Sequence, residues 1–128
     1  MYKQALSAGA LLAMVAVILG AFAAHGLKAV LPPDKIDIFQ KGVTYQFYHS
    51  FALLIVGILY SYYPSTLFRP ATLMFILGIV FFSGSLYLYP LLEAKNVDIP
   101  VIGRLITPLG GICFIIGWLL VLLGIIKK

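Results

Sequence analysis

The densest run of hydrogen-bonding side chains in the sequence is the stretch Thr44–Ser50, TYQFYHS. It places an amide, an imidazole, hydroxyls and two phenols at the start of a long apolar run. Nucleophilic or general acid–base catalysis needs a base that faces its nucleophile and a third group that orients the base. His49 and Ser50 are adjacent, so they do not face each other on a helix, and no carboxylate lies in the apolar runs of the chain. We therefore expect no enzymatic activity.

Two other kinds of chemistry would use the histidines or the cysteine. His25 and His49 could ligate one haem iron from two helices if both faced the same slot at equal depth, which stays open as an alternative. Cys113 is the one cysteine, so no disulfide can form within the chain, and in an apolar run its thiol behaves as a small protonated hydrophobe. No metal site and no cofactor is expected.

The composition is that of a membrane protein. Hydrophobic residues make up 62% of the 128 residues and charged residues 10%, whereas a soluble domain is about half apolar and about a quarter charged. The mean hydropathy is +1.08. The net charge of +5 comes from basic residues that stand singly at the ends of apolar runs, which is typical of contacts with lipid headgroups. Nucleic acid is therefore excluded as a partner, and the lipid bilayer is the expected environment.

Four continuous apolar runs predict transmembrane helices over about 5–25, 43–63, 71–89 and 106–126. Each is close to the roughly 20 residues that cross a hydrocarbon core as a helix. The first run exceeds the hydrophobic region of a signal peptide, so we expect it to be retained. Residues 34–41 form either a short interfacial helix or an extension of the second span. The predicted fold is an all-α, antiparallel four-transmembrane-helix bundle, with residues 1–128 as a single integral membrane domain.

Small residues at helical spacing mark the faces where these spans should pack, because membrane helices associate by close backbone approach rather than by hydrophobic burial. Each of the four spans has such a face. The predicted packing residues are Gly9, Ala13, Ala16 and Gly20 in the first span, Gly57 in the second, Gly78 in the third, and Gly110, Gly117 and Gly124 in the fourth.

An antiparallel chain brings the polar residues of all four spans to the same membrane side. We expect a polar cluster within one leaflet depth of that surface, centred on Gln46 and His49. Its predicted members are His25, Tyr45, Gln46, Tyr48, His49, Ser50, Ser83, Ser85 and Thr107. The cluster either fixes helix register through interhelical hydrogen bonds or lines a small cavity for a headgroup, ion or small solute. Whether His25 meets His49 or caps its own helix is left open, and Thr107-Pro108 is typical of a helix start.

Four segments resemble a known family: GAFAAHGL, TYQFYHSFALL, FSGSLY and TPLGGICFIIGW. They are similar to the signature segments of the small bacterial membrane proteins catalogued as domain of unknown function 423, the YgdD/YwdK-like family, which transmembrane protein 256-like proteins of eukaryotes also resemble. The resemblance runs from about Gly20 to Trp118. It implies a four-helix integral membrane protein of unassigned activity and carries over no catalytic or binding residue.

Two classes of function remain. The first is a structural scaffold that interacts with lipid or with a partner, either a second copy of the chain or another membrane protein. The second is a small transporter or channel-like protein that binds a solute, ion or headgroup at the polar cluster. We expect the bacterial plasma (inner) membrane, with cytoplasmic termini. The Lys/Arg counts on the two sides are nearly balanced, so the positive-inside rule does not decide the orientation.

Overall fold

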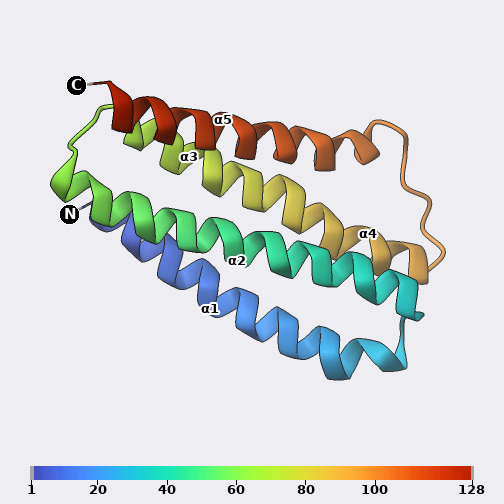
Figure 1. The fold of residues 1–128 in the computed structure, drawn as a ribbon. Coiled ribbons are helices and arrows are strands. Elements are labelled where there is room, and N and C mark those ends of the chain that lie inside the picture. The colour runs from blue at the N-terminus through green and yellow to red at the C-terminus, as the bar shows by residue number, and fades with distance from the viewer. Residues whose placement is uncertain (1, 128) are drawn as a thin grey trace.

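The computed structural model describes residues 2–127, and nearly all of them are helical (Figure 1). The elements are α1 (Lys3–His25), η1 (Gly26–Ala29), α2 (Pro33–Tyr62), α3 (Phe68–Gly78), η2 (Ile79–Ser83), α4 (Gly84–Ala94), η3 (Gly103–Leu105) and α5 (Ile106–Ile126). The π-helical turn η2 joins α3 and α4 into one continuous rod, here called the third span. Among the described residues, four helices are long and apolar enough to cross a membrane, which confirms the predicted all-α, four-span fold.

The second span is longer than its apolar run. Helix α2 begins at Pro33 and continues to Tyr62, so residues 34–41 extend the span instead of forming a separate interfacial helix. Its 30 residues rise about 45 Å, which exceeds a hydrocarbon core of about 30 Å. The helix passes through Gly42, where a side chain would stand 2.7 Å from the Tyr87 ring. Gly42 is therefore a site of close helix approach and does not end the helix.

The third span also runs beyond its apolar run. Pro90 lies inside α4, and the helix continues to Ala94, four residues past the proline. Proline is tolerated in membrane helices because neighbouring groups take up the freed backbone partner. The third span therefore ends at Ala94, five residues after the predicted end at residue 89.

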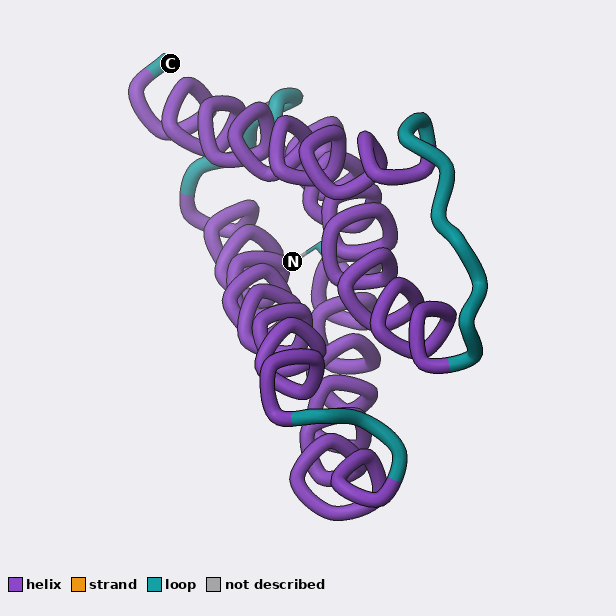
Figure 2. Tube along the Cα trace, turned by 90° about the vertical axis from the view of Figure 1, so that its right-hand side faces the viewer, coloured by secondary structure: helices purple, strands orange, loops and turns teal. Residues whose placement is uncertain are grey.

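The four spans are arranged with α2 and the third span in the middle and with α1 and α5 on the flanks (Figures 1 and 2). Helix α1 lies along α2, and α5 lies along α3 and η2. Both ends of the chain and the α2–α3 connection are at one end of the bundle, here called the terminal end. The α1–α2 and α4–α5 connections are at the opposite end, here called the loop end (Figure 1).

Phenylalanines and glycines set the packing of α5 on the third span. Gly110 lies against the backbone of Phe82, Gly117 against the Phe75 ring and Gly124 against the Phe68 ring. Both sets repeat at seven-residue intervals and run in opposite directions, so each phenylalanine residue meets one glycine, through its ring at Phe75 and Phe68 and through its backbone at Phe82. The exchange is reversed at Gly78, where the glycine belongs to the third span and lies against the ring of Phe114 on α5. The predicted glycines of α5, spaced seven residues apart, therefore allow phenylalanines of the third span to approach closely.

Small residues also bring α1 close to α2. A Cβ atom on Gly9 would stand 2.8 Å from the Ser50 carbonyl oxygen, and one on Gly57 would stand 2.6 Å from the Leu6 side chain. Of the other predicted packing residues in α1, Ala16 is buried, whereas Ala13 and Gly20 are partly exposed. The contact face therefore follows Gly9, Ala16 and Ala23 at seven-residue spacing, because α1 meets one helix along its length.

Ion pairs connect the helices at the loop end. Glu93 near the end of α4 pairs with Lys35 in the first turns of α2, and Arg104 in η3 lies 3.8 Å from the other Glu93 oxygen. The Tyr89 hydroxyl donates to the carbonyl of Gly103. These contacts connect α2, α4 and the start of α5 at one membrane surface.

Candidate functional site

Gln46 connects three spans with one side chain. It is 2% exposed. Its amide nitrogen donates to the Leu12 carbonyl of α1 at 2.7 Å, and its amide oxygen accepts from the Tyr87 hydroxyl of α4 at 2.5 Å. Both ends of the amide are therefore occupied by protein groups. A second contact one helical turn away, from the Ser83 hydroxyl to the Gly42 carbonyl at 2.7 Å, ties the third span to α2 again.

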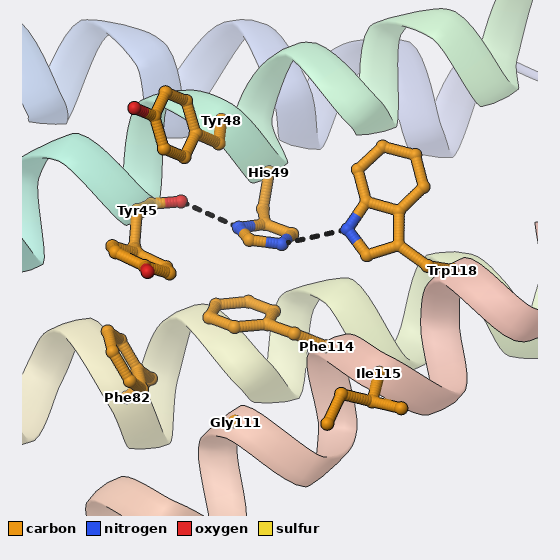
Figure 3. Close-up of a pocket in the computed structure, with 8 residues that line it drawn as sticks. All are labelled: Tyr45, Tyr48, His49, Phe82, Gly111, Phe114, Ile115 and Trp118. Carbon is orange, nitrogen blue, oxygen red and sulfur yellow. Dashed lines mark hydrogen bonds between the residues drawn. The ribbon is translucent and has the colours of Figure 1, made fainter.

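His49 connects α2 to α5 (Figure 3). The Trp118 indole donates from Nε1 to His49 Nε2 at 3.1 Å, and His49 Nδ1 lies 2.7 Å from the Tyr45 carbonyl oxygen. A carbonyl only accepts and an indole N–H only donates, so these partners fix the neutral tautomer with the proton on Nδ1. The imidazole also stacks on Phe114, with the ring centroids 3.5 Å apart and the planes at 6°.

The remaining predicted residues are distributed over other contacts. Ser85 and Thr107 join α4 to α5 at 2.5 Å, and Ser50 bonds back to the Gln46 carbonyl of its own helix. Ser83 and Ser85 face different neighbours, as expected from their spacing. Thr107 is the second residue of α5, whose N-cap is Leu105, so the helix begins two residues before the predicted start at Thr107-Pro108.

His25 is not part of these contacts. It is the last residue of α1 and is exposed, whereas His49 is buried and faces α5. The two histidines therefore share no slot, and both ring nitrogens of His49 already have partners in Tyr45 and Trp118. The geometry does not fit a haem iron held between the two histidines.

The contacts of Gln46 and His49 lie near the middle of the 30-residue helix α2. At about 1.5 Å per residue, His49 is about 24 Å from the Pro33 end of α2 and about 20 Å from its Tyr62 end. Trp118 is about 12 Å from the Ile126 end of α5. One leaflet of hydrocarbon is about 15 Å thick. That the polar cluster lies within one leaflet depth of the loop surface stays a prediction.

A groove on the outer surface lies beside this contact, between α2, η2 and α5 (Figure 3). Its volume is about 510 Å³. Its lining is almost wholly apolar and aromatic and consists of Tyr45, Tyr48, His49, Phe82, Gly111, Phe114, Ile115 and Trp118. Tyr48 is 57% exposed and Ile115 is 69% exposed, so the groove opens on a face that meets lipid. His49 forms part of its floor, with both nitrogens engaged.

Sequence reasoning missed Trp118, Phe114 and the role of Tyr87 in this region. Tyr87 is one helical turn after Ser83 and therefore faces α2 with it. Phe114 and Trp118 are also one turn apart in an apolar run, and both contact His49. The helical spacing within each pair of residues can be read from the sequence, but the partner of each residue on the facing helix cannot.

Comparison with known proteins places the chain in a family. The model of a family described as a protein of unknown function, DUF423, matches residues 19–111. The chain belongs to the DUF423 family. This confirms the resemblance drawn from the four segments. Most of the residues described above, from Gln46 to Gly111, lie within the DUF423 match, and Phe114 and Trp118 lie just beyond it.

Relatives of this DUF423 protein are named membrane proteins. The UPF0382 membrane protein of Staphylococcus aureus (strain bovine RF122 / ET3-1) is 44% identical over 119 residues, covering 93% of this chain and 92% of that protein. The UPF0382 membrane protein YwdK of Bacillus subtilis (strain 168) is 39% identical over 121 residues, covering 93% of each. No solved structure matches the chain. These relatives belong to Gram-positive bacteria, which is consistent with an integral protein of the plasma membrane.

Proposed function

We propose that this DUF423 protein is a membrane scaffold that interacts laterally with lipid or with a membrane partner, and not a transporter. One observation carries the proposal. Within residues 2–127, every buried side-chain nitrogen and oxygen has a hydrogen-bond partner in the protein itself. A solute site in a membrane needs polar groups that are free to replace the water of the solute. Here Gln46 and His49 use both ends of their side chains to hold helices together.

The distribution of polar side chains supports the same conclusion. A pathway for solutes requires polar groups through both leaflets. On the terminal side of His49 the buried polar side chains among the described residues are Ser50 and Thr72, and each donates to a carbonyl of its own helix. The rest of that half is filled by the cluster of Phe68, Phe75 and their neighbours.

A lateral mode of interaction follows from the outer surface. The groove beside His49 lies on the outer surface, between α2, η2 and α5 (Figure 3). Its exposed aromatic and aliphatic lining fits an apolar occupant, either a lipid or a side chain from another membrane protein. We further propose that the termini face the cytoplasm, so that the loop end lies on the outer side of the membrane.

Flux measurements on purified protein in sealed vesicles test the proposal. We expect potassium and proton leak from these vesicles to equal that of protein-free vesicles, and the Gln46→Leu variant to behave in the same way. A leak that exceeds the empty control and disappears in Gln46→Leu would favour the alternative of a small transporter or channel. Arg69→Gln, a surface change at the terminal end, serves as the matched control for reconstitution.

A further inference from the structure

We infer that the groove between α2, η2 and α5 holds the acyl chain of an anionic phospholipid whose phosphate contacts Lys41. The inference rests on the proposed scaffold function and specifies the lipid class. The occupant must be apolar because the groove lining is aromatic and aliphatic and the imidazole of His49 has no free nitrogen. Its position, alongside the middle of two transmembrane helices, is reached by lipid tails.

The shape of the groove favours a tail over a helix. A helix with its side chains is about 10–12 Å wide, so a groove of about 510 Å³ can admit single side chains from one but not the helix itself. The floor at Gly111 is open, because a Cβ atom there would meet only the Phe82 ring, at 4.0 Å. A narrow, flexible chain can lie along this channel between the Phe82 and Trp118 side chains.

Lys41 supplies a positive charge on the loop-end side of the groove. It precedes Tyr45 by one helical turn and Tyr48 by two, so the three residues lie on one face of α2. Lys41 is exposed and stands about 6 Å nearer the loop end than Tyr45. The neighbouring bases Lys35 and Arg104 are paired with Glu93. Lys41 forms no ion pair with any acid among residues 2–127, including Asp37 one turn earlier.

Two phenols line the groove on the side of this charge. Tyr45 and Tyr48 are 36% and 57% exposed, and neither hydroxyl bonds to another group in the described part of the chain. Tyrosine at the membrane interface keeps its ring in the apolar region and its hydroxyl near the headgroups. From the loop end inward, α2 therefore presents an ammonium group, two phenols and an aromatic channel. This order matches the phosphate, ester and tail of a phospholipid.

Native mass spectrometry of the purified full-length chain tests the inference with phosphatidylglycerol and phosphatidylcholine of identical tails. We expect one lipid to remain bound, with phosphatidylglycerol retained about fivefold better, since one lysine near anionic lipid is worth about 1 kcal/mol. Lys41→Gln should remove this preference but keep tail binding. Lys28→Gln, which changes another exposed lysine of the loop end, should leave the preference unchanged.

Gly111→Leu tests the channel, because its side chain would occupy the groove without displacing core residues. We expect binding of both lipids to fall at least tenfold, while Gly111→Ala keeps most of it. Thermal melting of each variant shows that the fold is retained. Equal retention of the two lipids by the unmodified chain, or unchanged binding in Gly111→Leu, would overturn the inference. A dimer that Gly111→Leu disrupts would identify a second copy as the occupant. None of these results depends on the vesicle leak assay, so the two proposals can fail separately.

Discussion

Gly110 and Gly111 are adjacent on α5, yet the structure predicts opposite effects when each is changed to alanine. A Cβ atom on Gly110 would lie 2.3 Å from the backbone nitrogen of Phe82 and 2.8 Å from its Cα, whereas one on Gly111 would meet only a Phe82 ring atom at 4.0 Å. Real Cβ atoms essentially never come within 3.0 Å of another heavy atom. In the Gly110→Ala variant, α5 must therefore move away from η2.

The magnitudes follow from two opposing terms. Overpacking costs about 1–3 kcal/mol, and the upper end applies at Gly110 because backbone atoms cannot rotate aside. Replacing glycine by alanine in a helix gains about 1 kcal/mol. We expect Gly110→Ala to lower the free energy of unfolding by about 2 kcal/mol and Gly111→Ala to raise it by up to about 1 kcal/mol. The two neighbouring variants should thus differ by about 3 kcal/mol.

Equilibrium unfolding in mixed micelles, followed by far-ultraviolet circular dichroism as sodium dodecyl sulfate is added, measures this difference. Gly84→Ala is a further control, since nothing lies within 4 Å of a Cβ atom there. If Gly110→Ala and Gly111→Ala unfold within about 0.5 kcal/mol of each other, the register of α5 on the third span is incorrect. The paired phenylalanines and glycines would then not set the packing.

Three further predictions concern the polar contacts and the orientation. Trp118→Phe keeps an aromatic ring but removes the donor to His49, so it should cost about 0.6–2 kcal/mol in the same titration; a cost below about 0.3 kcal/mol would exclude the hydrogen bond. Gln46→Leu should cost up to about 2 kcal/mol, and adding Tyr87→Phe should cost little more, because both changes remove one shared bond; additive losses in the double-mutant cycle would contradict the contact. Cys113 is buried, so Thr66→Cys should react with a membrane-impermeant maleimide only after the cells are opened; labelling of intact cells would reverse the proposed orientation.

The number and class of the spans could be predicted because lipid imposes simple requirements on length and polarity. The residues at which the spans begin and end could not be predicted. Pro33 begins a helix and Pro90 lies within one, whereas apolar runs end where charged or polar residues start. Amphipathic segments such as 34–41 stay helical beyond the hydrocarbon because they continue a formed helix, and hydropathy does not detect this.

The polar residues were identified from the sequence, but their partners were not. The π-helical turn Ile79–Ser83 changes the rotational phase between α3 and α4. It leaves Ser83 and Tyr87 facing α2, while Ser85 faces α5. No feature of the sequence marks such a turn, so a single expected cluster is distributed over separate helix crossings.

The position of Trp118 also makes the protein its own reporter. It is the one tryptophan in the chain, it borders the groove and it bonds to the buried imidazole of His49. Its fluorescence spectrum therefore responds both to whatever enters the groove and to the integrity of the α2–α5 contact, with no background from other indoles. Phospholipids brominated at chosen carbons would quench this emission most when the bromine lies at the depth of Trp118, so the unlabelled protein can report the position of its own indole in the bilayer.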